Sequence, residues 1–556
     1  MSDAAPSPGL YEQALAAAAA SGAALALAKP PRASAGVVPW RRRNGRIEVF
    51  WVRRSEAVPF MPGWHAFPGG GLARSDAELP VHGEPRHSFA GDTAKSVRSP
   101  IPVGSRVEGE EVDPDLVPGV VAAALRELWE ETGLLLVTAA AVLDDGADPE
   151  DGVAPGAPVA GTAASALPRD AGTAALAAAL RERGLALDAT QLVWAGRWLT
   201  PPFAPLRFDN RFFLLEWPED RAQQPSVVPG ELAEGEWVAP AAALARWHAG
   251  DVLAAPPILH FLRVLAEDAP EAGLRRLHDP VEADLGPFRR IEFRPGVVMV
   301  PLRTPTLPPA THTNAYLLGT GPMVLVDPGS PYPQEQDRLH AAIAAATSQL
   351  GRRLNAIWIT HHHPDHVGGV AAAAAAFDVP VAAHPATAER LAARGIRVNA
   401  FFHDGERAEL GPGFHVRILH TPGHARGHLA FLVEEDSTLL CGDLLSALST
   451  IVIDPPEGNM RDYLASLERC RELRPRFLFP AHGPVLRDGE RVLTQLIDHR
   501  RDREARVLAA WKSGVHEADA IVPLAYDEAE VPPPLRPIAA RQVLAHLDHL
   551  REQGLL

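Results

Sequence analysis

The apolar residues of the first half fall into short runs that are typical of strands. Residues 33–39 and 47–53 are two such runs, and the basic segment Arg41-Arg42-Arg43-Asn44-Gly45 separates them. Asn-Gly between two apolar runs is a strong hairpin signal, because both residues tolerate positive φ angles. The same pattern predicts a helix over 119–132 and strands near 191–198 and 211–216.

The second half shows short apolar runs that alternate with helical patterns, which indicates an α/β fold. The expected elements are strands at 297–301, 314–319, 323–326 and 355–359 and a helix at 333–349. The last segment, 491–556, is predicted to be mostly helical. In it Val543, Leu547 and Leu550 recur at helical spacing and form one apolar stripe.

Three segments lack this periodicity. Residues 73–118 are rich in Pro, Gly, Ser and acidic residues and predict a long surface insertion, and 144–173 predict loop and short helix. The polar, proline-bearing stretch 268–290 predicts a domain boundary. The expected organisation is an Ala-rich segment 1–30, a first domain 31–275 with the insertion 73–118, a second domain 280–490 and a C-terminal domain 491–556.

Composition narrows the class of protein. A hydrophobic fraction of 46% and a charged fraction of 22% are ordinary for a globular protein. With a net charge of −16, the chain lacks the excess of basic residues expected of a protein that binds long nucleic acid. Two cysteines exclude a disulfide scaffold and favour a reducing, cytoplasmic location. The run Ala14–Ala28 has no preceding Lys or Arg, so we expect neither a signal peptide nor a membrane span.

The strongest chemical signal is the histidine-rich turn THHHPDHVGG at 360–369, which directly follows the apolar strand 356–359. A tight turn after a buried strand directs alternate side chains into one cavity at the strand end. Imidazole and carboxylate groups suit Zn²⁺ and related first-row metals. Further candidates follow apolar runs downstream. They lie in the segments HTPGH at 420–424, LCGD at 440–443 and FPAHG at 479–483.

Together with the turn Asp327-Pro328-Gly329, these motifs resemble those of the metallo-β-lactamase superfamily over about 280–490. The resemblance implies an αβ/βα sandwich with two Zn²⁺ or similar first-row metals. It assigns His361, His363 and His424 to the first metal, Asp365, His366 and His482 to the second, and Asp443 to a bridge between them. Two neighbouring cations lower the pKa of a shared water, whose hydroxide attacks an ester, thioester or phosphodiester. Asp365 would also act as a catalytic base.

Two nearby histidines stand outside this assignment. His362 occupies the variable position of the motif and is not expected to be a ligand. For His428 two roles remain open: it supports a ligand, or it is an ordinary structural histidine.

The C-terminal part resembles one subfamily of these enzymes, the lactamase-β-like proteins with a small winged-helix-like domain. Some members of that group cut single-stranded RNA. The segment 491–556 carries nine Lys or Arg and ten Asp or Glu, whereas a phosphate-binding domain should have a positive surplus. An RNA substrate is therefore possible but not favoured, and a packing or lid module is the preferred interpretation.

The first half contains two separated pieces of a second motif, FMPGWHAFPGGG at 60–71 and RELWEETGL at 126–134. Glu130 and Glu131 follow Glu127 by three and four residues, so all three carboxylates share one helix face. Such a face suits Mg²⁺ or Mn²⁺, which bridges to substrate phosphates. Arg126 would orient the carboxylates. Gly69 and Gly70 would let the loop pass close to the helix and to the substrate.

These pieces resemble the Nudix box, here interrupted by 73–118 as in a subgroup of coenzyme A diphosphatases. The resemblance spans about 33–265 and implies an α/β/α sandwich with Glu131 and Arg126 in the catalytic machinery. It implies water attack on a CoA-type or other nucleoside-diphosphate-linked substrate. The first glutamate of the box should fall where Asp76 stands, so either Asp76 or Glu78 must serve.

The sequence thus predicts a bifunctional, metal-dependent hydrolase of small molecules, such as CoA derivatives. The alternative is a Nudix module that only binds a ligand, joined to a single-stranded RNA endoribonuclease. Oligomeric state is not encoded in any of these patterns.

Overall fold

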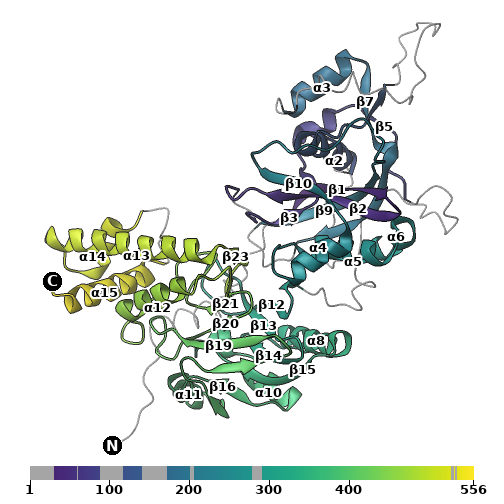
Figure 1. Ribbon diagram of the computed structural model, residues 1–556. Coiled ribbons are helices and arrows are strands. Elements are labelled where there is room, and N and C mark those ends of the chain that lie inside the picture. The colour runs from purple at the N-terminus through teal and green to yellow at the C-terminus, as the bar shows by residue number, and fades with distance from the viewer. Residues whose placement is uncertain are drawn as a thin grey trace, which may run out of the picture. The chain divides into compact units, whose positions relative to one another are not determined.

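The computed structural model divides the chain into two compact units, with the boundary along the chain near residue 290. Each unit is described separately (Figure 1). The structure describes residues 31–58, 61–87, 117–140, 169, 172–200, 206–278, 291–527, 531 and 535–556. The Ala-rich segment predicted at 1–30 and most of the loop predicted at 144–173 lie outside these residues. Among the described helices, none has the length and apolar character needed to cross a membrane.

The first unit is built on a mixed sheet in the order β10-β2-β1-β9-β8, with β3 paired to β2 and β4 paired to β1. Its strands are β1 (Arg32–Arg43), β2 (Arg46–Arg54), β3 (His65–Ala66), β4 (Gly69–Gly71), β8 (Leu192–Leu199), β9 (Phe208–Glu216) and β10 (Leu232–Val238). A smaller sheet, β5-β7-β6, contains β5 (Val81–His82), β6 (Val137–Ala139) and β7 (Leu185–Asp188).

The predicted hairpin is present but tighter than expected. The three arginines at 41–43 are paired strand residues rather than turn residues, because Arg43 lies opposite Arg46. Only Asn44 and Gly45 form the turn, with φ angles of 50° and 74°. Two consecutive positive φ angles are what a two-residue turn between twisted strands requires.

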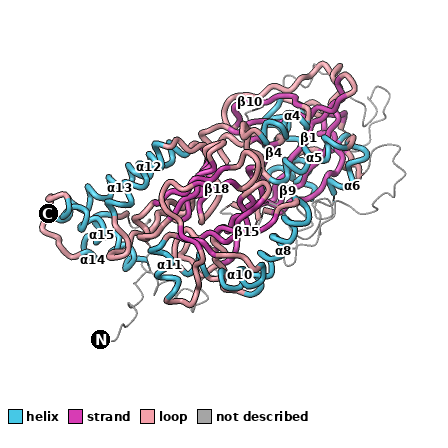
Figure 2. Tube along the Cα trace, turned by 60° about the horizontal axis from the view of Figure 1, so that its bottom comes forward, coloured by secondary structure: helices cyan, strands magenta, loops and turns pink. Residues whose placement is uncertain are grey.

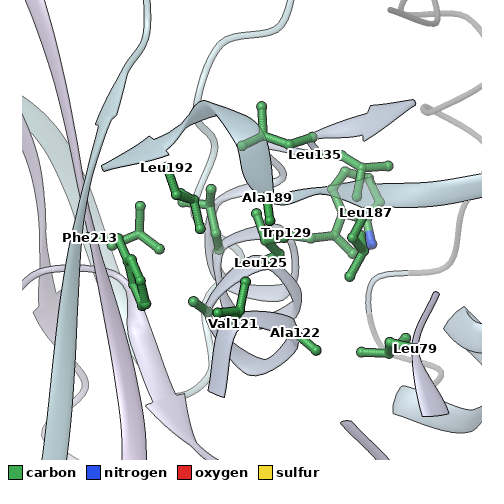
Figure 3. Packing of buried hydrophobic residues seen from close by; sticks show 14 of the residues in the cluster. Leu79, Val121, Ala122, Leu125, Trp129, Leu135, Leu187, Ala189, Leu192 and Phe213 are labelled. Carbon is green, nitrogen blue, oxygen red and sulfur yellow. The ribbon is translucent and has the colours of Figure 1, made fainter. Parts of the chain in front are cut away.

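Helices cover both faces of this sheet. Alternate residues of β1 face opposite cores: Val37 packs against helix α2 (Val117–Thr132), and Val38 packs against α5 (Pro256–Glu267) and its neighbours. Figure 3 shows Leu125 and Trp129 of α2 facing Leu187, Leu192 and Phe213. The remaining helices of this unit are α3 (Thr173–Glu182), η4 (Ala189–Gln191, 3₁₀), α4 (Pro240–His248) and α6 (Pro270–His278). The unit is an α/β/α sandwich.

Two segments predicted to be irregular are partly structured. The start of the predicted insertion contains a 3₁₀ helix, η2 (Arg74–Glu78), and strand β5, and it buries Leu79 and Asp76. Part of the predicted boundary 268–290 is helix α6, whose Leu274 and Leu277 enter the core. Both segments were predicted to be irregular because they are polar on average. Each supplies only a few apolar residues to a core that other elements mainly form. Residues 88–116 and 279–290 lie outside the described part.

The second unit contains two sheets with helices outside them. The first has the order β11 to β17: β11 (Ile291–Arg294), β12 (Val297–Arg303), β13 (His312–Leu318), β14 (Pro322–Val326), β15 (Arg353–Trp358), β16 (Val381–Ala383), β17 (Ala400–Phe401). The second has the order β18 to β23: β18 (Arg407–Glu409), β19 (His415–His420), β20 (Leu429–Val433), β21 (Thr438–Gly442), β22 (Phe477–Pro480), β23 (Leu486–Arg487). Aromatic pairs join the sheets, with the ring centroids of Trp358 and Phe431 5.2 Å apart.

Helices α8 (Pro333–Leu350) and α10 (Val370–Phe377) contact the first sheet, and α12 (Met460–Glu472) packs on the second. This is an αβ/βα sandwich. The remaining helices are α9 (Pro364–Val367), α11 (Pro385–Ala392), α13 (Gly489–Lys512), α14 (Ala518–Ala525) and α15 (Arg536–Glu552). Figure 2 shows α13, α14 and α15 side by side near the C-terminus.

The C-terminal helices have their own small core, which contains the predicted stripe Val543, Leu547 and Leu550. They also join the core of the preceding sandwich, since Leu493 and Ile497 of α13 and Ala545 of α15 pack beneath the second sheet. The segment is therefore continuous with the sandwich rather than tethered to it.

Candidate active sites

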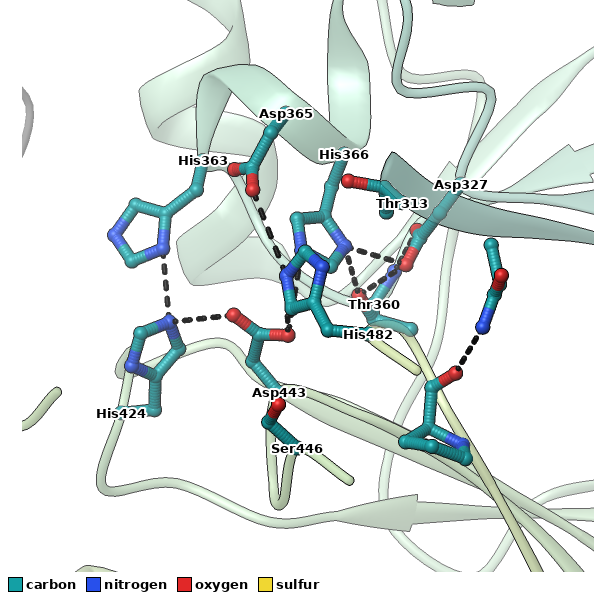
Figure 4. Close-up of polar contacts among 12 residues, drawn as sticks. Thr313, Asp327, Thr360, His363, Asp365, His366, His424, Asp443, Ser446 and His482 are labelled. Carbon is teal, nitrogen blue, oxygen red and sulfur yellow. Dashed lines mark hydrogen bonds and ion pairs between the residues drawn. The ribbon is translucent and has the colours of Figure 1, made fainter. Parts of the chain in front are cut away.

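All seven candidate metal ligands stand just beyond the C-terminal ends of strands. β15 leads into the turn that holds His361, His363, Asp365 and His366. His424 follows β19, Asp443 follows β21 and His482 follows β22. Because these strands end at the same edge of the two sheets, residues more than a hundred positions apart meet in one buried place (Figure 4).

Three histidines form the first cluster. The Nε2 atom of His361 lies 2.8 Å from Nδ1 of His363, and Nε2 of His424 lies 2.9 Å from the same Nδ1. All three side chains are buried. Their three nitrogens therefore face a common point, as the ligands of one cation would.

Asp443 lies between this cluster and a second one. Its Oδ2 is 3.5 Å from His424 Nε2, whereas its Oδ1 is 3.5 Å from His366 Nε2 and 3.3 Å from His482 Nε2. Asp365 Oδ2 lies 3.6 Å from His482 Nε2 and completes the second cluster. One carboxylate thus presents one oxygen to each cluster, which is the geometry of a bridging ligand.

Several ligand-type atoms here are buried without a hydrogen-bond partner. They include both carboxylate oxygens of Asp365, Nε2 of His366 and Oδ1 of Asp443. Asp365 and His366 are 0% exposed. An ionised carboxylate without donors is costly to bury unless a cation compensates it. The donor set of nitrogens and oxygens therefore fits first-row divalent metals.

The protonation states of the histidines differ between the two clusters. Burial holds the pKa of His361 and of His363 well below the usual range, so both are neutral and can offer a lone pair. Burial also opposes protonation of His366, but Asp443 and Asp327 raise its pKa well above the usual range. For Asp443, burial would raise the pKa, yet His482 and His366 together hold it well below its ordinary value.

Asp327 orients one ligand. Its Oδ2 is 2.8 Å from His366 Nδ1, and it also accepts hydrogen bonds from the backbone and the hydroxyl of Thr360. A carboxylate on one imidazole nitrogen directs the other nitrogen toward a metal. Gly329 in the same turn is required by space, because a Cβ there would lie 1.8 Å from the carbonyl oxygen of Asp365.

Two further histidines, His424 and His482, are oriented by backbone carbonyl groups. His424 Nδ1 lies 2.6 Å from the carbonyl oxygen of Val452, and His482 Nδ1 lies 3.0 Å from that of His312. Of the two roles open for His428, the structure favours support of a ligand: its Nε2 accepts a hydrogen bond of 3.0 Å from the backbone N–H of Asp443. His362 is buried beside the site but belongs to none of the ligand groups found among the described residues.

Asn314 and Tyr316 on β13 hold the turn that carries His482. The amide of Asn314 donates to the carbonyl oxygens of Pro480 and Gly483, at 3.0 and 2.9 Å, and the hydroxyl of Tyr316 donates to Pro480 at 2.6 Å. Neither residue was predicted to belong to the site. Both lie in the strand predicted at 314–319, which is a weak signal, since nothing local marks a contact across 164 or 169 positions.

In the first unit, Arg126 of α2 is the centre of a buried ionic network. Its Nε is 2.6 Å from Asp76 Oδ1, and its Nη1 is 2.7 Å from Glu130 Oε2 and 3.0 Å from Glu127 Oε1. Asp76 is 0% exposed, whereas Glu78 is exposed. Of the two candidates for the first acidic position, Asp76 is therefore the one that contacts the arginine.

The glycine loop touches the same helix. The backbone N–H of Gly69 donates to Glu131 Oε2 at 2.7 Å. Gly70 lies against Glu127, and a Cβ at position 70 would come within 2.2 Å of its Oε1. Burial raises the pKa of Glu127 to about 7 and that of Glu131 to about 8, with repulsion from neighbouring carboxylates adding to both shifts.

Three family models match parts of this chain. Residues 308–482 match the family model of the metallo-beta-lactamase superfamily, residues 14–265 that of the NUDT19 Nudix domain, and residues 518–556 that of the beta-lactamase associated winged helix domain. Lactamase-like protein vrtG of Penicillium aethiopicum is 31% identical over 229 residues, which cover 40% of this chain and 68% of that protein.

The chain is a Nudix–metallo-β-lactamase fusion. It is a hydrolase with a winged-helix domain at its C-terminus. It is 28% identical over 254 residues to an atrochrysone carboxyl ACP thioesterase of Aspergillus fumigatus, covering 44% of this chain and 72% of that protein. A solved NUDIX hydrolase from Alicyclobacillus acidocaldarius is 31% identical, with 44% of this chain and 95% of that chain covered and a TM-score of 0.33.

The two domains differ in how far their ligand-type residues are assembled. Within the described part of the chain, groups of three or more ligand-type residues with their ligand atoms within 4.8 Å of one another occur only among the histidines and aspartates of the metallo-β-lactamase domain. The Nudix carboxylates at 127, 130 and 131 form no such group. Like charges on one helix face repel, and Arg126 lies between two of the carboxylates. Their role as metal ligands remains a prediction.

Loss of the Asp76 carboxylate should destabilise the Nudix domain. We expect Asp76→Ala to lower its free energy of unfolding by about 3 kcal/mol, because Arg126 would remain buried without its main partner. Urea unfolding followed by tryptophan fluorescence measures this, since all but Trp358 and Trp511 of the 11 tryptophans lie in this domain. The exposed Glu78→Ala is the matched control and should change nothing. Equal stability of the two variants would contradict the prediction.

Proposed function

We propose that the metallo-β-lactamase domain is a dinuclear metal hydrolase. The observation that supports this most directly is the position of Asp443, whose two oxygens face two separate clusters of ligand atoms. His361, His363 and His424 would hold one cation, and Asp365, His366 and His482 the other. Zn²⁺ is the cation that this donor set suits best, and related first-row metals are compatible with it.

Bound metals would supply an activated water and stabilise the oxyanion that develops on the substrate. The protein's own residues prepare the site for that chemistry. Asp327 and the carbonyl of Val452 fix the ring orientations of His366 and His424. Asp365, whose carboxylate oxygens accept no hydrogen bond, is positioned to take up a proton at one of them.

The substrate class that we infer is a thioester, and an acyl-CoA in particular. Two lines support it. A similar protein is named an acyl-carrier-protein thioesterase. The fused Nudix domain resembles enzymes that act on CoA, so both domains would then meet the same carrier. RNA is less well supported, because the C-terminal segment has no positive surplus.

For the Nudix domain we propose hydrolysis of a diphosphate in CoA or a related nucleoside-diphosphate conjugate. Glu127, Glu130 and Glu131 offer only oxygen atoms, a donor set that fits Mg²⁺ or Mn²⁺. Arg126 holds two of these carboxylates in place, and Glu131 would be the catalytic base. The N–H of Gly69 is already bonded to Glu131, so contact with substrate would come from the rest of the loop, including Gly70.

A second candidate for this domain is a module that binds its ligand without hydrolysing it. The observation in its favour is that Glu130 pairs with Arg126 rather than converging with Glu131. In that case the small-molecule ligand would serve the metallo-β-lactamase domain.

The test is a substrate panel run on the intact protein with Zn²⁺ or Mg²⁺. Acyl-CoA should yield free thiol, and CoA should yield adenosine 3′,5′-bisphosphate. Elemental analysis should find about two metals per chain in the metallo-β-lactamase site. Removal of metal with a chelator should abolish thiol release, and added Zn²⁺ should restore it. Release of neither product, with cleavage of short single-stranded RNA instead, would overturn the proposal.

A further inference from the structure

We propose that Gln542 and Arg500, in the C-terminal helices, are positioning residues for the first metal site. The inference rests on the proposed metal-binding function. It assigns to the winged-helix domain the task of holding one loop of the metallo-β-lactamase domain, rather than that of guiding nucleic acid.

The loop in question contains Ile451, Val452 and Ile453. The carbonyl oxygen of Val452 lies 2.6 Å from Nδ1 of His424. If that nitrogen carries the proton, Nε2 keeps its lone pair, and Nε2 is the atom that faces His363 and Asp443. The position of one carbonyl group therefore decides which nitrogen of His424 can bind a cation, and in which direction.

Gln542 of α15 makes hydrogen bonds on both sides of this carbonyl. Its side-chain amide donates to the carbonyl oxygen of Ile451 at 2.7 Å, and its Oε1 accepts from the backbone N–H of Ile453 at 3.2 Å. Gln542 is 5% exposed. Because Gln542 forms hydrogen bonds with the backbone of the residues before and after Val452, it fixes the peptide groups between them.

Arg500 of α13 supports the same loop from a second helix. Its Nη2 donates to the carbonyl oxygen of Ile451 at 2.5 Å, and its Nη1 is 3.4 Å from Gln542 Oε1. It is 2% exposed, and its guanidinium lies 5.2 Å from the ring centre of Tyr463. Arg541, next to Gln542 on α15, pairs with Asp454 at the end of the loop. Side chains from both helices thus converge on 451–454.

The loop has no strand or helix of its own to hold it. Residues 443–459 lie between β21 and α12, and backbone hydrogen bonds within regular elements are absent from 451–453. Burying the polar groups of such a loop requires partners from elsewhere. Here those partners come from the C-terminal helices, so the first metal site is complete only when these helices are in place.

The test uses Gln542→Met in the full-length protein, because methionine keeps the volume of the side chain and removes its hydrogen bonds. Metal affinity is measured by competition with a chromophoric chelator, and the geometry of the site by the visible absorption of the Co²⁺-loaded protein. We expect one of the two metals to bind about tenfold more weakly, the other to be unchanged, and the Co²⁺ spectrum to shift.

Three further variants separate positioning from general stability. Gln553→Met is the same substitution at the exposed residue that directly follows α15 and contacts His549, and it should bind both metals like the wild type. Leu547→Ala weakens the core of the C-terminal helices without touching the loop. Gln542→Glu keeps the acceptor for Ile453 and Arg500 and should restore part of the affinity.

The outcomes are distinct. Wild-type protein that binds no pair of metals would overturn the proposed function itself. Wild-type protein that binds two metals, with Gln542→Met equal to it in affinity and spectrum, would overturn only the positioning role. A loss of affinity in Leu547→Ala as large as that in Gln542→Met would also overturn it, because the effect would then follow domain stability.

Discussion

Replacing Asp443 with asparagine should lower thioester hydrolysis by about 1,000-fold, since the loss of metal-based stabilisation is worth several kcal/mol. The amide keeps the shape of the side chain but loses the charge that both clusters share. Its nitrogen cannot bind a cation, so the one oxygen left at position 443 can serve only one of the two clusters. Steady-state rates with an acyl-CoA measure the effect, and elemental analysis should show that less than the wild-type amount of metal is retained.

The control for Asp443→Asn is a buried histidine in the same place that is not a ligand. His362 contacts the rings of His361 and His363 but lies outside the ligand groups. His362→Gln should therefore retain metal and most of the activity. If Asp443→Asn kept full activity and full metal content, the bridging role would be wrong, and hydrolysis would have to occur elsewhere in the chain.

Glu131→Gln should lower diphosphate hydrolysis by about 1,000-fold, within the usual contribution of a general base, and leave thioester hydrolysis unchanged. Burial already raises the pKa of Glu131 to about 8, and the hydrogen bond from Gly69 holds its carboxylate against the glycine loop. Glutamine keeps that contact but can neither accept a proton nor supply a charged ligand. Release of adenosine 3′,5′-bisphosphate from CoA measures the first effect, and thiol release from acyl-CoA the second.

The reciprocal variants complete this experiment. Asp443→Asn should leave the diphosphatase rate at its wild-type value, because the two sites belong to separate compact units. Glu78→Gln, at the exposed residue near the box, should affect neither reaction. If wild type and Glu131→Gln both lack diphosphatase activity while thiol release persists, the Nudix domain is a ligand-binding module, the second candidate proposed above.

Sequence and structure agree best where the relevant residues are local. His361, His363, Asp365 and His366 lie in one turn after one strand, and Glu127, Glu130 and Glu131 lie on one helix face. In both cases backbone geometry alone places the side chains on the same side of their own turn or helix. The stripe Val543, Leu547 and Leu550 was found for the same reason.

The C-terminal helices show which contacts local sequence patterns cannot predict. Their helical content and apolar stripe follow from spacing, but their contacts with the loop at 451–453 join residues 89 or 91 positions apart. The charge count argued only against a nucleic-acid role. It could not reveal that buried side chains of these helices hold the carbonyl beside His424.

The sequence by itself determined the two domain types, their order, the seven histidines and aspartates of one site and the acidic helix face of the other, because each depends on residue identity at short spacing. Tertiary structure alone decided that Asp76 rather than Glu78 contacts Arg126, that Asp327 orients His366, and that Asn314 holds the His482 turn. Those choices depend on which helices, turns and strand ends pack against one another in the fold. No periodic pattern in the sequence predicts these contacts, since they arise from packing between elements that are distant in sequence.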